Sequence, residues 1–140
     1  MKELINCFLP YGEESDLKRT IKGLKDSGFV KNIYLLSGEE RPVLEGCEVL
    51  KCGGLKETAT LRSVVSLCDT PYTLLYTKTT ALDWGYLALA RWIQILDDVN
   101  APFSYADHFN VANGQRSNAP VIDYQRGSLR DDFDFGPVWI

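Results

Sequence analysis

Short apolar runs alternate with amphipathic segments over the first hundred residues of the chain. Four runs are short and mostly apolar, as buried strands are: residues 3–10, 32–37, 47–52 and 72–77. Such alternation of strands and helices predicts a mostly parallel sheet between two layers of helices.

The segment after the first apolar run predicts a helix. Glu14 and Asp16 stand where a helix start favours negative charge, and Gly28 supplies the stop. The apolar positions recur at helical spacing at Leu17, Ile21 and Leu24.

Two further helices are expected. The second helix is expected to be capped near Thr58 or Thr60, and the third to be capped by Asp83. The inward face of the second helix is expected to carry Leu61, Val64, Val65 and Cys68. That of the third is expected to carry Tyr86, Leu89, Ala90, Ile93 and Leu96.

The pattern changes after residue 100. Segments 102–110 and 119–125 flank 112-ANGQ-115, and Asn-Gly is the strongest short signal for a hairpin. Residues 133–140 are typical of one more strand. The fold class is therefore α/β, three-layered and Rossmann-like, with antiparallel or mixed strands added after residue 100.

Composition narrows the function classes. The chain has 140 residues, 45% hydrophobic and 24% charged, as expected of one globular domain. A net charge of -4 gives no overall basic field for nucleic acid. We expect no signal peptide and no membrane span, and hence a cytoplasmic location. A C-x4-C pair without a nearby histidine favours buried thiols over zinc, and the cysteines are Cys7, Cys47, Cys52 and Cys68.

The segment 77-TKTT-80 is the first candidate for chemistry. It follows an apolar strand and precedes a helix, which is where open α/β sheets bind their ligands. Lys78 is either a counter-charge for phosphate or a solvated lysine at a strand end. Thr77, Thr79 and Thr80 either donate hydroxyl hydrogen bonds to a ligand or serve as ordinary turn residues.

The order of elements resembles the family 2 glycosyltransferases, which have the nucleotide-diphospho-sugar transferase fold called GT-A. In 8-FLPYGEE-14, Tyr11 and Glu13 are in register with the family's Pro-x-Tyr-Asn-Glu turn, and Gly12 replaces the asparagine. The stretch 60-TLRSVVSLCDTPYTLLYTKT-79 is similar to the helix and strand that lead to the family's D-x-D. The segments 105-YAD-107 and 127-GSL-129 resemble later portions of the family pattern.

The resemblance implies transfer of a sugar from a nucleoside diphosphate to an acceptor hydroxyl, with a divalent Mn²⁺ or Mg²⁺ held by D-x-D and a later Asp as base. Three positions depart from this pattern. Thr77-Lys78-Thr79 replaces D-x-D and offers no carboxylate for a hard cation. Ser37-Gly38-Glu39 stands where carboxylates contact the nucleotide, so Ser37 or Glu39 takes over that contact or it is lost. The family's acceptor helix and catalytic Asp would follow Ile140, so residues 1–140 are expected to form a single domain that is either truncated or a shortened relative. The catalytic base is then missing unless another carboxylate replaces it, and no catalytic residue is assigned.

Within that domain, residues 1–100 are expected to bind the nucleotide and residues 101–140 to form the hairpin and acceptor-side strands. Each further candidate has an ordinary structural alternative. Tyr11 stacks on a base or lies at the core edge, while Glu13 bonds a ribose or begins a helix. Arg62 and Lys56 face phosphates or solvent.

The remaining candidates belong to the acceptor side. Asp107 matches the strand-end aspartate of the family, and His108 is either an acid-base group or an ordinary histidine. The cluster Arg130, Asp131 and Asp132 contacts sugar or acceptor, or forms a salt-bridged turn. Trp84, at the expected start of the third helix, stacks on a sugar or packs in the core, and Trp92 lies eight positions later on the same helix.

Two functions from different classes follow. One is a glycosyltransferase of polysaccharide synthesis with a nucleoside-diphosphate sugar and a glycan acceptor as partners, working without metal or with metal bound elsewhere. The other is a non-catalytic domain that binds a nucleotide or a partner protein. A nucleotidyltransferase is disfavoured, because 9-LPYGEESDLKRT-20 lacks a glycine-rich, arginine-bearing phosphate loop. The sequence leaves a homo-oligomer open.

Overall fold

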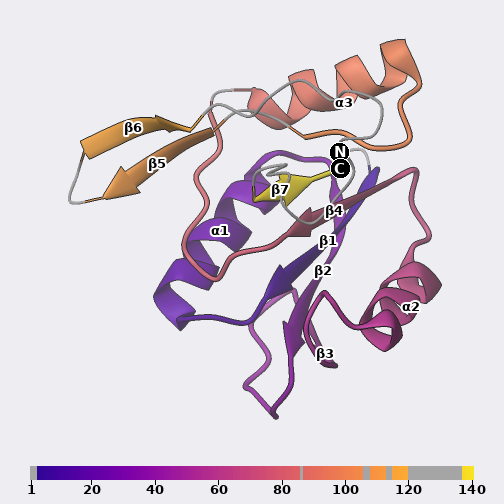
Figure 1. Ribbon diagram of the computed structural model, residues 1–140, viewed down its shortest axis with the longest axis vertical. Coiled ribbons are helices and arrows are strands. Elements are labelled where there is room, and N and C mark those ends of the chain that lie inside the picture. Colours follow the sequence, from indigo (N-terminus) through magenta and orange to yellow (C-terminus); the bar gives the residue numbers. More distant parts are fainter. Residues whose placement is uncertain (1–2, 86, 106–107, 113–114, 120–136) are drawn as a thin grey trace.

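The computed structural model describes residues 3–85, 87–105, 108–112, 115–119 and 137–140 (Figure 1). Helices and strands follow in the order β1 (Ile5–Pro10), α1 (Glu14–Asp26), β2 (Val30–Ser37), β3 (Glu48–Lys51), α2 (Thr58–Leu67), β4 (Tyr72–Tyr76), α3 (Ala88–Val99), β5 (His108–Ala112), β6 (Gln115–Ala119) and β7 (Val138–Trp139). The predicted strand and helix order of the first hundred residues is confirmed.

Five strands form the main sheet, in the order β3-β2-β1-β4-β7. The first four are parallel and β7 is antiparallel to β4. Strand β1 is central, with Cys7 level with Ile33 on one side and Leu74 on the other. The fold is therefore α/β with a mixed, mostly parallel sheet, as the sequence predicts.

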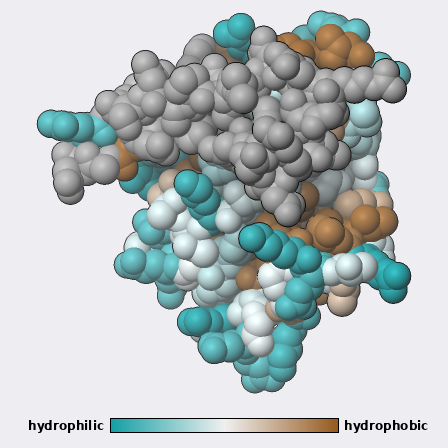
Figure 2. Space-filling model, in the orientation of Figure 1, coloured by the Kyte–Doolittle hydropathy of each residue, from teal (hydrophilic) through white to brown (hydrophobic). Residues whose placement is uncertain are grey.

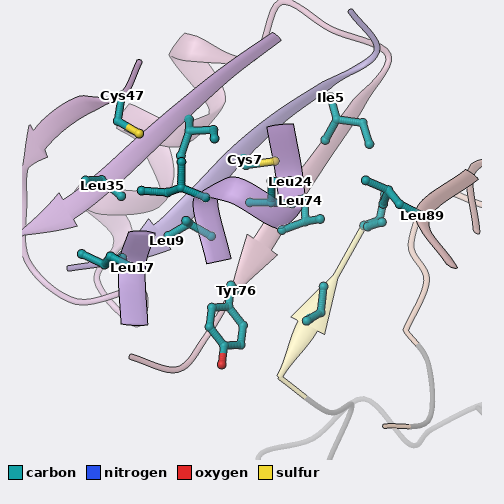
Figure 3. Packing of buried hydrophobic residues seen from close by; sticks show 14 of the residues in the cluster. Ile5, Cys7, Leu9, Leu17, Leu24, Leu35, Cys47, Leu74, Tyr76 and Leu89 are labelled. Carbon is teal, nitrogen blue, oxygen red and sulfur yellow. The ribbon is translucent and has the colours of Figure 1, made fainter. Parts of the chain in front are cut away.

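Helices cover both faces of this sheet. On β1, Ile5, Cys7 and Leu9 belong to one core cluster, together with buried side chains of α1 and α3 (Figure 3). Phe8 points to the other face and stacks on Tyr34, with ring centroids 5.0 Å apart, in a smaller cluster that includes Val64 of α2. Successive side chains of β1 thus point to opposite faces of the sheet, where α1 and α3 cover one face and α2 covers the other.

Helix α2 starts as expected near Thr58, with Glu57 at its N-cap position and no side-chain bond to the helix start. The expected start of the third helix is wrong. Helix α3 begins at Ala88, with Leu87 in the left-handed region at φ 55° before it. Asp83 lies outside α3 because its carboxylate is held by an arginine of α1, as described below.

The inward faces are partly as expected. On α3, Leu89, Ile93 and Leu96 are buried, in agreement with the prediction. On α2, Val64 is buried, whereas Leu61 and Val65 are 42% and 71% exposed. The apolar residues of α2 therefore occupy two faces, and the outer one is open to solvent.

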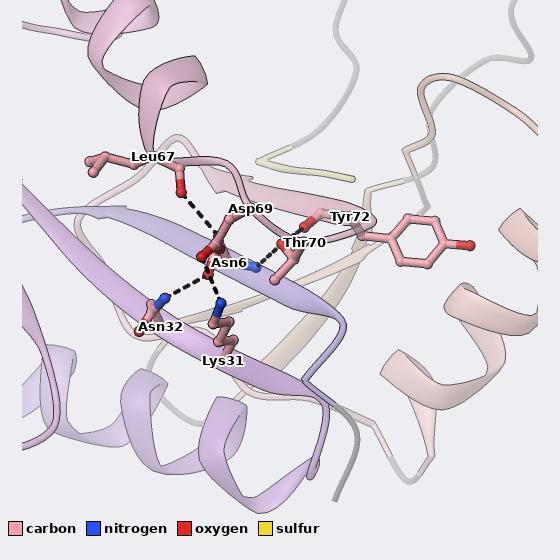
Figure 4. Close-up of polar contacts among 7 residues, drawn as sticks. All are labelled: Asn6, Lys31, Asn32, Leu67, Asp69, Thr70 and Tyr72. Carbon is pink, nitrogen blue, oxygen red and sulfur yellow. Dashed lines mark hydrogen bonds and ion pairs between the residues drawn. The ribbon is translucent and has the colours of Figure 1, made fainter.

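A buried amide joins the strands to the end of α2 (Figure 4). The Asn6 side chain is fully buried, and its Nδ2 donates to the Leu67 carbonyl at 3.2 Å and to Asp69 Oδ1 at 2.8 Å. Its Oδ1 accepts from Asn32 Nδ2 at 3.1 Å. Lys31 donates to the other Asp69 oxygen at 2.6 Å, and this bond lowers the pKa of Asp69. The network fixes the amino-terminal edge of the sheet.

The predicted hairpin is present as a separate two-stranded sheet. Strands β5 and β6 pair antiparallel from His108 opposite Ala119 to Ala112 opposite Gln115. The second strand thus precedes most of the expected segment 119–125, whose residues from 120 onward lie outside the described part. The predicted final strand is present as β7. None of the described helices is both long enough and apolar enough to cross a membrane.

Candidate functional site

The carboxyl ends of the four parallel strands meet at one edge of the sheet. Strand β1 is followed by Tyr11, β2 ends at Ser37, β3 at Lys51, and β4 is followed by Thr77. The chain leaves β1 toward β2 over one face, and reaches β4 over the opposite face through α2. Strand order therefore reverses between β1 and β4, the place where open α/β sheets bind ligands.

At this reversal the loops after β1 and β4 touch. A Cβ atom added to Gly12 would lie 2.6 Å from the Thr79 carbonyl oxygen and 2.9 Å from Thr79 Cβ. Position 12 thus has no room for a side chain. The close approach brings Tyr11 and the segment 77–80 to one place.

The segment 77–80 divides into an anchored start and an exposed end. Thr77 donates from its backbone nitrogen and its hydroxyl to the Pro137 carbonyl, at 2.8 and 3.0 Å. Tyr76 donates its hydroxyl to the Thr80 carbonyl at 2.9 Å. Lys78, Thr79 and Thr80 are exposed. Of the proposed ligand donors, Thr77 is therefore already engaged within the fold.

Lys78 is the exposed cation of this segment. Its ammonium group makes no hydrogen bond or ion pair with a described residue. An exposed ammonium that pairs with no described residue is available to an anionic ligand at the end of this strand.

Tyr11 is held by the loop after β2. Its backbone nitrogen donates to the Leu36 carbonyl at 2.8 Å, and its hydroxyl donates to the Pro42 carbonyl at 2.9 Å. The Arg41 guanidinium carbon lies 5.5 Å from the centre of the Tyr11 ring, a cation-π distance. One ring face is thus covered by Arg41, and stacking of a base is left to the other face or requires Arg41 to move.

Arg41 is a residue that the sequence pattern did not single out. It lies in the polar loop 38–41, and its guanidinium is 3.6 Å from the Glu39 carboxylate. A basic residue two positions after Glu39 is the only sequence signal, because the contact with Tyr11 depends on the pairing of β1 with β2.

Ser37 is engaged within its own turn. Its hydroxyl donates to the Glu39 carbonyl at 2.9 Å and accepts from the Glu39 backbone nitrogen at 3.2 Å. The Ser37 carbonyl accepts from the Cys52 backbone nitrogen at 2.8 Å. Ser37 therefore shapes the edge of the site, with one lone pair of its hydroxyl left for a ligand.

Glu13 begins α1 and takes its N-cap position without a side-chain bond to the helix. Its carboxylate accepts from Ser15 Oγ at 3.2 Å. Glu14 and Asp16 add two more carboxylates in the first turn, as expected for a helix start. This group makes the α1 side of the edge acidic, opposite in sign to Lys78.

The chain after the site runs along α1 and holds the 77–80 segment in place. The Leu82 backbone nitrogen donates to Thr20 Oγ1 at 2.9 Å, and Asp83 forms an ion pair with Arg19. The Trp84 Cδ1 atom lies 3.1 Å from a Cβ added to Gly23. The ion pair with Arg19 holds Asp83 beside α1, away from the start of α3. Trp84 packs against α1, in agreement with core packing as the alternative to a sugar contact.

The predicted phosphate contact Arg62 lies on the exposed side of α2. It lines a shallow hollow of about 330 Å³ together with Leu61 and Val65. Lys56 is exposed just before α2. No described contact joins either residue to Lys78.

Other predicted residues fall elsewhere. Asp107, Arg130, Asp131 and Asp132 lie outside the described residues. Among the described residues, no group of three histidine, cysteine or acidic side chains is placed to hold a metal ion. Thr77, Lys78 and Thr79 themselves carry no carboxylate to offer a divalent cation.

A larger hollow lies at the opposite, amino-terminal edge of the sheet. It measures about 430 Å³ and is lined by Tyr72, Thr73, Asp97 and Asn100, among others. The Tyr72 hydroxyl donates to Asp97, and this bond raises the pKa of Tyr72. This hollow is separate from the edge of the sheet that carries Lys78.

Comparison with known protein families, with characterised proteins and with solved structures finds no match for this chain.

Proposed function

We propose that the chain is a GT-A-like domain that binds a nucleoside-diphosphate sugar and transfers the sugar to an acceptor hydroxyl in polysaccharide synthesis. The observation that supports it best is the reversal of strand order between β1 and β4, where Gly12 meets Thr79 and Lys78 is exposed. The resemblance of 8-FLPYGEE-14 and 60-TLRSVVSLCDTPYTLLYTKT-79 to family 2 glycosyltransferases agrees with that position.

Lys78 has the central role in this proposal. The diphosphate leaving group gains negative charge as the sugar departs, and a positive group fixed beside it stabilises that charge. Lys78 supplies the charge as an ammonium, without a metal at the D-x-D position. The exposed hydroxyls of Thr79 and Thr80 donate to the phosphate oxygens, and no described residue is assigned as the base.

The loop after β2 supplies the nucleoside side of the site. The ring of Tyr11 offers one face to a base, and Ser37 and Glu39 lie at the adjacent strand end, where the family contacts its nucleotide. Arg41 adds a cation to this side of the site. Its guanidinium either stays on the Tyr11 ring or moves away from the ring to contact a phosphate.

A second candidate is a non-catalytic nucleotide-binding or protein-interaction domain of the same fold. It is favoured by the sequence Thr77-Lys78-Thr79, which offers no carboxylate for the metal that the resembled transferases use. In this case a nucleotide or partner binds without sugar transfer.

Calorimetric titration tests whether the protein binds a nucleotide at all. We expect UDP or GDP to bind without Mn²⁺, and Lys78→Ala to weaken binding by roughly tenfold, about 1.4 kcal/mol, because a charge-assisted contact is lost. Lys22→Ala, at an exposed lysine of α1 that pairs with Asp26, is the control and is expected to bind as the wild type does. Absence of heat with every nucleotide, or an unchanged affinity of Lys78→Ala, would contradict the proposal.

A transfer assay then separates the two candidates. Release of free sugar or a glycosylated acceptor from a nucleoside-diphosphate sugar supports the transferase. Nucleotide binding without either product supports the non-catalytic domain.

A further inference from the structure

Helix α3 carries apolar residues on two sides. Leu89, Ile93 and Leu96 face the core, whereas Ile95 and Val99 are 55% and 63% exposed, and Leu87, just before the helix, is 57% exposed. Ile95 and Val99 are four residues apart and form a stripe along the outer side of the helix. Figure 2 shows hydrophobic surface at the top of the molecule, over α3. Exposed apolar stripes of this kind mark contact surfaces.

The charges of α3 run against the helix dipole. Arg91 lies in the first turn, where negative charge is favoured, and Asp97 and Asp98 lie in the last turn, where positive charge is favoured. Asp97 accepts from the Tyr72 hydroxyl. Arg91 has no ion pair with a described residue, and Asp98 accepts a hydrogen bond from the Gln94 amide at 3.1 Å. Among the described residues, neither the cation near the start of the helix nor the anion near its end thus has an oppositely charged partner.

We propose that α3 is a self-association surface, on which α3 of a second copy packs antiparallel about a two-fold axis near Ile95. Ile95 lies four residues after Arg91 and three before Asp98, which is about 6 Å and about 4.5 Å along the helix. An antiparallel copy therefore places Arg91 of each chain beside Asp98 of the other. A parallel copy would place equal charges together, so the charge pattern selects the antiparallel arrangement.

The second copy also places charges of the favourable sign at both ends of each helix. Asp98 of one chain comes near the start of α3 in the other, and Arg91 near its end. The exposed aliphatic side chains lose contact with water at the same time. Because a single helix pair buries less than a standard interface, the dimer is expected to be weak and to depend on concentration.

Sedimentation velocity over a concentration series tests this surface with charge reversals. We expect the wild type to shift toward a dimer as concentration rises, and Arg91→Asp to remain monomeric because Asp then faces Asp98. The double variant Arg91→Asp with Asp98→Arg restores the opposite charges and is expected to dimerise again. A wild type that stays monomeric, or a double variant that stays monomeric, would overturn the proposal.

The fold of these variants has an internal control. Both reversals place charges of the favourable sign at the ends of α3, so dilute, monomeric variants are expected to unfold at the wild-type temperature or slightly above it. Loss of the dimer then reports on the surface and not on unfolding.

Cysteine cross-linking tests the position of the axis. In a background with Cys52→Ser and Cys68→Ser, Ile95→Cys is expected to form a disulfide-linked dimer on oxidation. Gln94→Cys, one position away and off the stripe, is the matched control and is expected to cross-link far more slowly. Equal rates for the two variants would contradict an axis near Ile95.

Discussion

The contact between Gly12 and Thr79 makes a quantitative prediction about the edge that carries the site. Gly12→Ala introduces a Cβ atom 2.6 Å from the Thr79 carbonyl oxygen, whereas ordinary contacts begin at 3.4 Å, so one loop moves by about 0.8 Å. The neighbour is backbone, and it is restrained because Thr77 and Leu82 on either side are hydrogen bonded. We expect a loss of about 1–3 kcal/mol in the free energy of unfolding.

Gly54→Ala is the matched control. Nothing lies within 4 Å of a Cβ atom at position 54, so the same chemical change meets open space there. We expect Gly54→Ala to leave stability unchanged or to raise it by about 0.4–1 kcal/mol through the unfolded state.

Urea unfolding followed by circular dichroism measures both variants, and amide NMR spectra report on residues 77–80. Gly12→Ala is expected to lower the midpoint and to shift the Lys78 and Thr79 amides, and Gly54→Ala to do neither. If Gly12→Ala is as stable as Gly54→Ala and leaves these amides in place, the two loops do not touch and the description of the site is wrong.

Three more predictions concern the core. Asn6→Ala removes three side-chain hydrogen bonds and is expected to cost about 2–4 kcal/mol, against about 1 kcal/mol for Asn32→Ala, which removes one of them; equal losses by urea unfolding would contradict the network. Burial, and to a lesser extent the Cys47 thiol, raise the pKa of Cys7 from 9.0. The buried thiol therefore contributes stability below pH 9.0, and this contribution is lost as pH rises above 9.0, because the unfolded chain then loses the thiol proton first. Cys7→Ala should therefore lose less stability than the wild type between pH 8 and 10, and parallel pH profiles would refute this. Tyr76→Phe removes the hydroxyl bond to Thr80 and is expected to cost about 1 kcal/mol, and an unchanged unfolding midpoint would count against that bond.

The strands were predictable because each apolar run lies in a sheet covered on both faces. Strand β1 is the best example, since all residues from Ile5 to Leu9 are buried and Asn6 is the one polar residue among them. The buried Asn6 interrupts the pattern without ending the strand, because its partners come from α2 and β2.

The outer faces of α2 and α3 were harder to foresee. An apolar stripe has the same spacing whether it faces the core or solvent, so Val65 was expected inside and lies outside. Likewise Asp83 has the residue type of a helix cap, but its partner Arg19 lies 64 positions away in the sequence. Such contacts depend on strand order and cannot be derived from local pattern.

The candidate site likewise combines features that follow from the local sequence with features that depend on strand order. The position of Lys78 at a strand end follows from the sequence, because a buried run precedes it. The close approach of Gly12 to Thr79 and the position of Arg41 over Tyr11 require β4 and β2 to be the two neighbours of β1, which only the fold supplies.

The most direct test of the central claim is where a nucleotide binds. Amide chemical shifts of the labelled protein, recorded while UDP or GDP is added, locate the contact residue by residue. We expect the changes to concentrate at Tyr11, Ser37 and residues 77–80 at the carboxyl edge. Changes confined to the amino-terminal hollow around Tyr72 and Asn100, or no changes at millimolar nucleotide, would contradict the account.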